Sequence, residues 1–270
     1  MLAPIEVARL EEARAAAMLS ASARESRAWA AGTMGFSGKG SWQNQVMGAG
    51  LGIPVDASLL TEMIDFYTSR GVEPRIELCP FVDESLLHGL STQLFTIREL
   101  ENVLFFDLEA DIPELPLGWP PGVEVELVDR NDASAVEELV ETSLSGFFAP
   151  GDPIPEALRE VSRRVIAMHR TRGFIAKLEG RAVGGGLLDL GEGAANLAGT
   201  SVLPETRRRG IQQALMVARL RAARDHGCRV ATIDSKPGIP TERNAVRLGF
   251  AMAYTKFVVA KAGEGLEPSA

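Results

Sequence analysis

Residues 207–212 read Arg-Arg-Arg-Gly-Ile-Gln and place three cations beside a glycine. They follow a stretch typical of a strand and precede a helical pattern that runs from Ile211 to about Gly227. Free N–H groups and the positive dipole end at a helix start attract anions. Arginines add charge-assisted hydrogen bonds, and Gly210 lets the backbone approach a ligand closely. The turn therefore predicts a pyrophosphate site, and a solvated basic turn is the alternative.

The composition sets this basic turn against an acidic background. The 270 residues suffice for one large domain or two small ones, and 46% hydrophobic with 24% charged residues is typical of a soluble globular protein. The net charge of −8 disfavours binding to nucleic acid or to an anionic membrane. The two cysteines form neither a disulfide framework nor a zinc motif. With no signal peptide and no membrane-length apolar run, we expect a cytoplasmic protein without a metal.

The elements that must hold the turn are clearest in the second half of the chain. Periodicity and capping residues predict strands at 123–128, 174–178, 182–190, 195–203, 230–234 and 251–260, and helices at 132–144, 155–169, 211–226 and 241–249. Thr241 is expected to cap the last of these helices. The order predicts an α/β (α+β) fold around a sheet of mixed strand directions.

The first half repeats part of this order after an N-terminal helix at about 4–28. Residues 44–54 resemble 196–204, and a helix, a strand, a helix and a strand follow at 58–70, 75–78, 84–94 and 102–108. The sequence distance between corresponding residues of the two copies grows along the chain. It is 150 residues between Pro54 and Pro204 and 156 residues between Gly71 and Gly227. The first copy therefore lacks about six residues where the second has the basic turn, unless the resemblance of the two halves is accidental.

A proline-rich stretch at 110–122 separates the two halves and is typical of an extended connector. We therefore expect a degenerate first domain at 1–109, a connector at 110–122, a catalytic domain at 123–262 and a tail at 263–270.

The second half resembles the GNAT superfamily of N-acetyltransferases over about residues 121–260. The family's acyl-CoA signature, Arg/Gln-x-x-Gly-x-Gly/Ala, corresponds to residues 207–212, with Gln212 in place of the last small residue. The family's later Asn…Gly-Phe segment corresponds to Asn244 through Phe250. The resemblance implies a GNAT fold in both halves, as a tandem pair with a degenerate first copy.

The resemblance also implies a set of contacts to acetyl-CoA. The backbone N–H groups of Val202 and Leu203 would face the thioester carbonyl and the pantetheine arm. The pyrophosphate would be held by Arg207, Arg208, Arg209, Gly210, Ile211 and Gln212. Asn244 and Arg247 would line the groove for the rest of the cofactor.

Two departures from the family pattern concern proton transfer. Many members carry a tyrosine four residues before the glycine of Gly-Phe as general acid, and Ala245 stands there. Some carry a glutamate as general base where Asn196 stands, and an amide cannot take up a proton at neutral pH. Tyr254 on the last strand is the substitute acid, with packing at the sheet edge as the alternative. A proton could also be relayed through water by one of three carboxylates near strand ends, Asp189, Glu192 and Asp234.

The prediction is thus an N-acetyltransferase that moves an acetyl group from acetyl-CoA to a primary amine of a small molecule, by direct attack in a ternary complex. No nucleophilic triad indicates a covalent intermediate. One alternative is a non-catalytic acyl-CoA sensor or interaction protein, and another is an enzyme that acts on a protein or peptide N-terminus. Only about ten strand-like residues follow Phe250. The first half or a second subunit, as in a homodimer, is therefore expected to complete the acceptor pocket.

Overall fold

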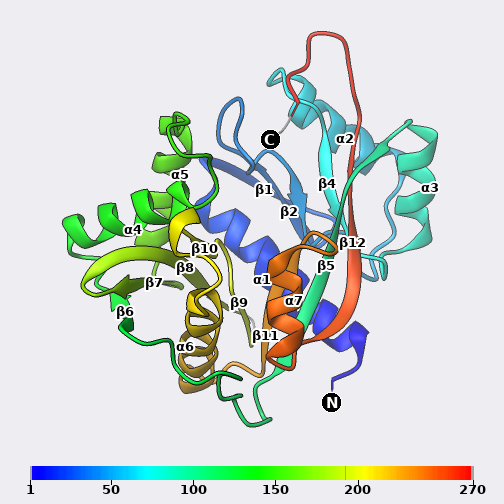
Figure 1. Ribbon diagram of the computed structural model, residues 1–270. Coiled ribbons are helices and arrows are strands. Elements are labelled where there is room, and N and C mark those ends of the chain that lie inside the picture. The colour runs from blue at the N-terminus through cyan, green and yellow to red at the C-terminus, as the bar shows by residue number, and fades with distance from the viewer. Residues whose placement is uncertain (1, 192, 269–270) are drawn as a thin grey trace. The chain divides into compact units, whose positions relative to one another are not determined.

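The computed structural model describes residues 2–191 and 193–268 (Figure 1). The chain forms two compact units, one of Met1–Val103 with Ala253–Ala270 and one of Leu104–Met252. Two long strands, β5 (Thr96–Asp107) and β12 (Ala251–Ala260), contribute residues to both units. Among the described residues, no helix combines the length and the apolar character that crossing a membrane requires.

The first unit is a mixed sheet flanked by helices. In chain order its elements are α1 (Pro4–Ser22), β1 (Glu25–Trp29), β2 (Gly32–Phe36), β3 (Val46–Met47), α2 (Ala57–Thr68), β4 (Arg75–Leu78) and α3 (Glu84–Thr92). Parts of β5 and β12 complete the sheet, whose strand order is β1-β2-β3-β4-β12-β5. The strands β3 and β4 run parallel, whereas β12 pairs with β4 antiparallel.

The placement of β12 differs from the expected domain boundaries, which assigned residues 123–262 to one domain. Phe257 of β12 lies opposite Leu78 of β4 in an antiparallel ladder. The side chains of Tyr254 and Val259 lie in the hydrophobic core of the first unit. Backbone hydrogen bonds and side-chain packing therefore both tie this strand to the first unit.

A hairpin near the N-terminus replaces the end of the helix expected at 4–28. The helix α1 ends at Ser22, and β1 and β2 then pair antiparallel. The turn between them is made by Ala30 and Ala31, whose φ angles are 45° and 66°. Hairpin turns with positive φ are usually marked by Asn or Gly. The sequence Ala-Ala carries no such mark, so sequence reasoning missed the turn.

The second unit contains the basic turn. Its elements are β6 (Val123–Val128), α4 (Ala133–Ser145), α5 (Glu156–Ala167), β7 (Thr171–Leu178), β8 (Arg181–Gly191), β9 (Ala194–Asn196), β10 (Ser201–Val202), a 3₁₀ turn at Pro204–Thr206, α6 (Ile211–Asp225), β11 (Val230–Ser235) and α7 (Pro240–Arg247). Together with the end of β5, the strands follow the order β5-β11-β9-β8-β7-β6, and β10 pairs with β8. Asp132 caps α4 by accepting hydrogen bonds from two backbone amides, as its position predicts.

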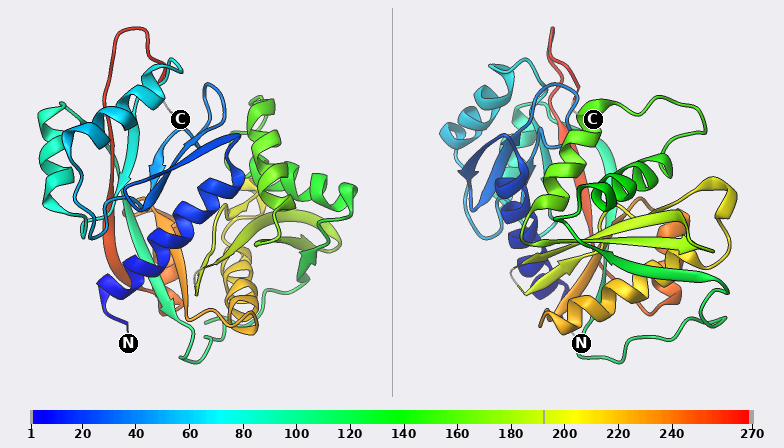
Figure 2. Two further views of the ribbon diagram at one scale, coloured as in Figure 1. Left: turned by 180° about the vertical axis from the view of Figure 1, so that it is seen from behind. Right: turned by 90° about the vertical axis from the view of Figure 1, so that its left-hand side faces the viewer.

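Glycines in β8 let helices approach both faces of the sheet. A Cβ atom on Gly185 would lie 2.3 Å from Oγ of Ser143 in α4, and one on Gly186 would lie 2.8 Å from Nη1 of Arg219 in α6. Successive residues of a strand point to opposite faces. The helix α4 therefore covers one face and α6 the other (Figure 2).

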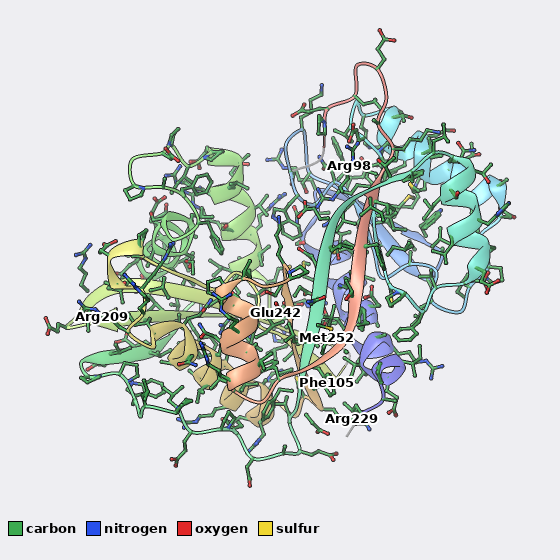
Figure 3. The ribbon with its side chains drawn as sticks, turned by 45° about the vertical axis from the view of Figure 1, so that its right-hand side comes forward. Arg98, Phe105, Arg209, Arg229, Glu242 and Met252 are labelled. Carbon is green, nitrogen blue, oxygen red and sulfur yellow. The ribbon has the colours of Figure 1, made fainter. Side chains whose placement is uncertain are left out.

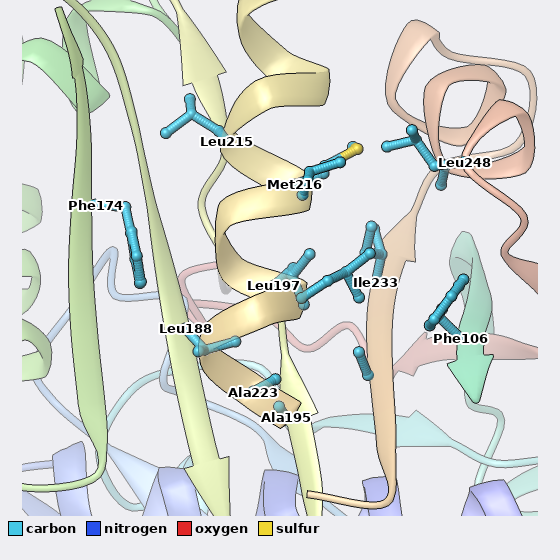
Figure 4. Close-up of a cluster of buried hydrophobic side chains, with 14 of the residues drawn as sticks. Phe106, Phe174, Leu188, Ala195, Leu197, Leu215, Met216, Ala223, Ile233 and Leu248 are labelled. Carbon is cyan, nitrogen blue, oxygen red and sulfur yellow. The ribbon is translucent and has the colours of Figure 1, made fainter. Parts of the chain in front are cut away.

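The main core of the second unit lies between α6 and the sheet. Leu215 and Met216 of α6 meet Leu188 of β8 and Ile233 of β11 in this core (Figure 4). Ile211, at the start of the helix, is also buried there. Packing therefore fixes the position of the first turn of α6 relative to the strands.

The two halves of the chain share an element order, as the sequence repeat predicts. The series β3-α2-β4-α3-β5 in the first half of the chain matches the series β9/β10-α6-β11-α7-β12 in the second half. Both series begin with strands that form a parallel pair, β3 with β4 and β9 with β11. Residues 48–56, which are all described, connect β3 to α2 without a 3₁₀ turn, whereas Pro204–Thr206 forms one before α6.

Candidate acyl-CoA site

The basic turn has an unusual backbone. After the 3₁₀ turn, Arg208 and Gly210 both adopt left-handed conformations, with φ angles of 64° and 80°. A glycine tolerates this conformation without strain, whereas an arginine does so at some cost. A Cβ atom on Gly210 would lie 3.1 Å from the Pro120 ring. Position 210 therefore favours glycine on two counts, backbone conformation and space.

The turn leads directly into the first turn of α6. The backbone N–H groups of Ile211 and Gln212 have no acceptor within an α-helix at this position. The side chains of Arg208 and Arg209 are exposed in front of them, and Arg209 is labelled in Figure 3. Exposed guanidinium groups beside unpaired amides and a positive dipole end form an environment that suits phosphate oxygens.

Arg207 has partners other than the expected pyrophosphate. Its guanidinium donates hydrogen bonds to the backbone oxygens of Val202, at 3.1 Å, and Gly146, at 2.9 Å. The side chain thereby joins the turn to β10 and to the end of α4. In this arrangement Arg207 supports the turn, although all three arginines are exposed, and the structure shows such contacts to backbone oxygens for Arg207.

Gln212 links the turn to α7. Its side-chain amide donates to Oγ1 of Thr241 at 3.0 Å and accepts from Nδ2 of Asn244 at 2.6 Å. Arg247 in turn donates to Oδ1 of Asn244 at 3.2 Å. The structure thus brings together Gln212, Asn244 and Arg247.

The expected capping role of Thr241 was wrong. The helix α7 begins at Pro240 without a side-chain cap, and the Thr241 hydroxyl accepts a hydrogen bond from Gln212 instead.

The strand expected at 195–203 is divided into β9 and β10. The strand β9 pairs parallel with β11, and this pairing ends where the N–H of Leu197 donates to the oxygen of Thr232 at 2.9 Å. The chain then leaves β11 but stays beside β8, with which both β9 and β10 pair antiparallel. Two parallel strands therefore separate at their carboxyl ends, which is where ligands bind in open α/β sheets.

The separation gives Val202 and Leu203 different roles. The N–H of Leu203 donates to the oxygen of Val183 in β8 at 2.8 Å, so it does not face a ligand as expected. Residues of an antiparallel strand alternate between bonding to the neighbouring strand and facing away from it. The N–H of Val202 therefore points away from β8, to the side from which β11 has separated.

Asn196 lies at the end of β9 and is buried. Its side-chain amide donates to Oγ1 of Thr232 at 3.1 Å and to Oδ2 of Asp234 at 2.8 Å. The amide therefore holds the carboxylate of Asp234 near the carboxyl end of β11. Of the other candidate carboxylates, Asp189 forms an ion pair with Arg170 at 2.7 Å, and Glu192 lies outside the described residues.

Tyr254 lies in the first unit, whereas the basic turn lies in the second. Its hydroxyl donates to Oε1 of Glu12 at 2.7 Å. Burial, with a contribution from the charge of Glu12, raises the pKa of Tyr254 well above its ordinary value. Nζ of Lys256 lies 3.5 Å from carboxylate oxygens of both Glu12 and Glu77. These contacts describe a structural hydrogen bond, and an acid role for Tyr254 stays a prediction.

Sequence reasoning missed Arg219, a fully buried arginine in α6. Its guanidinium donates to the segment between β9 and β10. The sequence did mark this residue, because position 219 lies four residues after Leu215 and thus on the apolar face of the predicted helix. A charged residue at such a position is rarely buried without a structural or functional reason.

Residues 136–250 match the model of the acetyltransferase (GNAT) family. The segment that contains the basic turn therefore matches the GNAT family, as the signature at 207–212 predicts. A comparison with curated proteins found no match to the chain.

Solved structures of GNAT proteins share the fold over most of the chain. A GCN5-related N-acetyltransferase from Kribbella flavida matches 93% of this chain and 97% of its own, with a TM-score of 0.67 at 17% identity. A tandem GNAT protein from the clavulanic acid biosynthesis pathway matches 84% and 76%, with a TM-score of 0.61 at 14% identity. These likenesses confirm the GNAT fold and its tandem arrangement.

Proposed function

We propose that the second unit is an N-acetyltransferase that transfers the acetyl group of acetyl-CoA to a primary amine of a small molecule. The observation that carries this proposal is the turn at 207–210, which opens α6 inside the segment that matches the GNAT family. The amides and arginines of this turn suit the negatively charged pyrophosphate of acetyl-CoA.

The proposal assigns the two ends of acetyl-CoA to two parts of the second unit. Arg208, Arg209 and the amides of Ile211 and Gln212 bind the pyrophosphate. The acyl end reaches the separation between β10 and β11, where the N–H of Val202 donates to the thioester oxygen. A backbone donor at this oxygen stabilises the negative charge that develops on it during attack.

The chemistry is direct attack in a ternary complex. The amine nitrogen forms a bond to the acetyl carbon, the carbon–sulfur bond breaks, and CoA leaves as a thiolate. Because a thiol titrates near ~8.5, the thiolate leaves without strong help from a general acid. Asp234, held by Asn196, accepts the proton that the amine loses, through water.

A second candidate function is a non-catalytic sensor that binds acyl-CoA. Ala245 and Asn196, at the positions of the family's acid and base, favour it. Such a protein would bind acetyl-CoA at the same turn and would show no turnover with any amine.

Calorimetric titration of the purified protein with acetyl-CoA tests the shared part of both proposals. We expect a single site of micromolar affinity, or about −8 kcal/mol. A screen of small amines and peptides for release of free CoA thiol then separates the enzyme from the sensor. Turnover with a small amine supports the proposal, turnover with peptides alone redirects it to protein N-termini, and binding without turnover favours the sensor.

A further inference from the structure

Arg219 places an isolated positive charge inside the second unit. The residue is 0% exposed, and burial lowers the pKa of its guanidinium to about 9. In the part of the chain that the structure describes, no carboxylate forms an ion pair with it. A buried charge without a counter-ion is costly, and an apolar side chain of similar length would be cheaper to bury. Fold stability alone therefore does not account for an arginine here.

The guanidinium donates to backbone and hydroxyl oxygens of β8, of the segment between β9 and β10, and of its own helix. Nε donates to the oxygen of Leu215 at 3.0 Å. Nη1 donates to the oxygens of Leu187, at 3.0 Å, and Ala198, at 3.2 Å. Nη2 donates to Oγ1 of Thr200 at 2.6 Å. These hydrogen bonds fix the planar group in one orientation.

Two of these acceptors lie in the segment 197–200, where the chain leaves β11 while it stays beside β8. The oxygen of Ala198 also accepts from the N–H of Leu187 at 2.9 Å, so two donors hold it. Val202, whose N–H faces the separated side, follows Thr200 by two residues. The position of that N–H is therefore determined by the bend that Arg219 holds.

Gly186 provides the space for this arrangement. A Cβ atom there would lie 2.8 Å from Nη1 and 2.9 Å from the central carbon of the Arg219 guanidinium. The guanidinium cannot yield without losing its hydrogen bonds to Leu187 and Ala198. An alanine at 186 would therefore displace the group while leaving its charge in the protein.

We infer that Arg219 is a positioning residue for the acyl-thioester: it holds the bend between β9 and β10 so that the N–H of Val202 points at the thioester oxygen. This inference rests on the proposed function. The pyrophosphate end of the site, at residues 208–212, does not depend on Arg219. Arg219 acts on the acyl end of the site alone. Its role can therefore be measured separately from binding of the pyrophosphate.

The test compares Arg219→Met, Arg219→Lys and Gly186→Ala with the wild type, and uses Arg221→Met, an exposed arginine on the same helix, as the control. The probe is acetyl-CoA labelled with ¹³C at the thioester carbonyl. Its infrared carbonyl stretch reports the hydrogen bond to the oxygen, and titration with CoA reports the pyrophosphate end.

We expect the bound carbonyl to absorb at lower frequency than in solution for the wild type and for Arg221→Met. In Arg219→Met and Gly186→Ala the band returns toward the solution frequency, while the Kd of CoA changes less than about threefold. Once an acceptor is known, loss of one oxyanion donor predicts a fall in kcat of about 100-fold. Arg219→Lys keeps the charge but cannot reach all acceptors. Its carbonyl band is therefore expected between that of the wild type and that of Arg219→Met.

Two results overturn the inference. One is an unchanged carbonyl band in folded Arg219→Met or Gly186→Ala, and the other is a lowered melting temperature as the sole effect of all three variants. If the wild type itself binds no acetyl-CoA, the proposed function fails first and the inference falls with it. If the wild type binds acetyl-CoA with a shifted carbonyl band and the variants show the same band, only the inference about Arg219 fails.

Discussion

Gly210 is the residue at which the turn is most sensitive to substitution. Its φ of 80° and its nearness to Pro120 leave little room for a side chain. We expect Gly210→Glu to reduce acetyl-CoA affinity at least about 100-fold, because it adds bulk, strain and negative charge where the pyrophosphate binds. Calorimetry measures the loss, with Gly238→Glu, at a solvent-exposed left-handed glycine, as the matched control. Unchanged affinity in Gly210→Glu would place the site elsewhere.

The three arginines of the turn divide into two kinds. Replacing Arg208 and Arg209 with alanine removes exposed cations, so we expect weaker binding of CoA with little change in binding of a pantetheine fragment. Arg207→Ala breaks two hydrogen bonds to backbone oxygens, so we expect a lower melting temperature as well. Titration with both ligands and thermal denaturation check this division. Equal losses for CoA and pantetheine would contradict it.

Tyr254 tests whether the last strand takes part in catalysis. Its buried hydroxyl donates to Glu12, so Tyr254→Phe removes a hydrogen bond worth about 1–2 kcal/mol of stability. We expect a lower melting temperature and an unchanged kcat. A loss of rate at neutral pH, where the Tyr254 hydroxyl is protonated, without a loss of stability would instead make Tyr254 the acid that its sequence position suggested.

At the scale of single residues, the sequence revealed which residue types gather at the turn but not how each is used. A sequence motif does not distinguish the three arginines 207–209. Only the fold shows that Arg207 donates to the backbone oxygens of Val202 and Gly146. Leu203 differs from Val202 only through strand register, which a one-residue shift would invert. Arg219 could have been flagged by its place on the apolar face, but its acceptors come from distant residues.

At the scale of elements, the capped helices and the strands at 75–78 and 123–128 were predicted well, whereas the break within 195–203 and the hairpin at 25–36 were not. The helices α4 and α6 begin where their sequence signals predicted, because Asp132 and Gly210 mark those starts. The division of 195–203 into β9 and β10 depends on the end of the pairing with β11, while the pairing with β8 continues. The hairpin at 25–36 depends on a turn of two alanines. Local sequence determines neither feature.

The link between α6 and α7 gives a prediction at this scale. Gln212→Ala restores the small residue that the GNAT signature carries and removes hydrogen bonds to Thr241 and Asn244. We expect stability to fall by about 1–2 kcal/mol, while acetyl-CoA affinity stays within about threefold. Thermal denaturation and calorimetry measure both, with Gln213→Ala as the control. A large loss of affinity would show that Gln212 itself contacts the ligand.

At the scale of the whole molecule, the repeat predicted a tandem fold but not the unit to which the last strand belongs. In the strand order of the first unit, β12 lies between β4 and β5. We expect a chain that ends at Met252 to lose the folded structure of residues 1–103, because β4 and β5 then lack their shared neighbour. Limited proteolysis with mass spectrometry would show rapid cleavage there, and a chain that ends at Pro268 serves as the control. Protection equal to the full chain would contradict the assignment.

The placement of β12 also determines when the first unit can be completed during translation. Residues 1–103 leave the ribosome first, but the strand that joins β4 to β5 is made only after residues 104–252. At an elongation rate of about 5–20 residues per second, that interval lasts on the order of ten seconds. Until then the edges of β4 and β5 are open to pairing with other nascent chains. The order of synthesis thus makes the first half of this protein the last to finish folding.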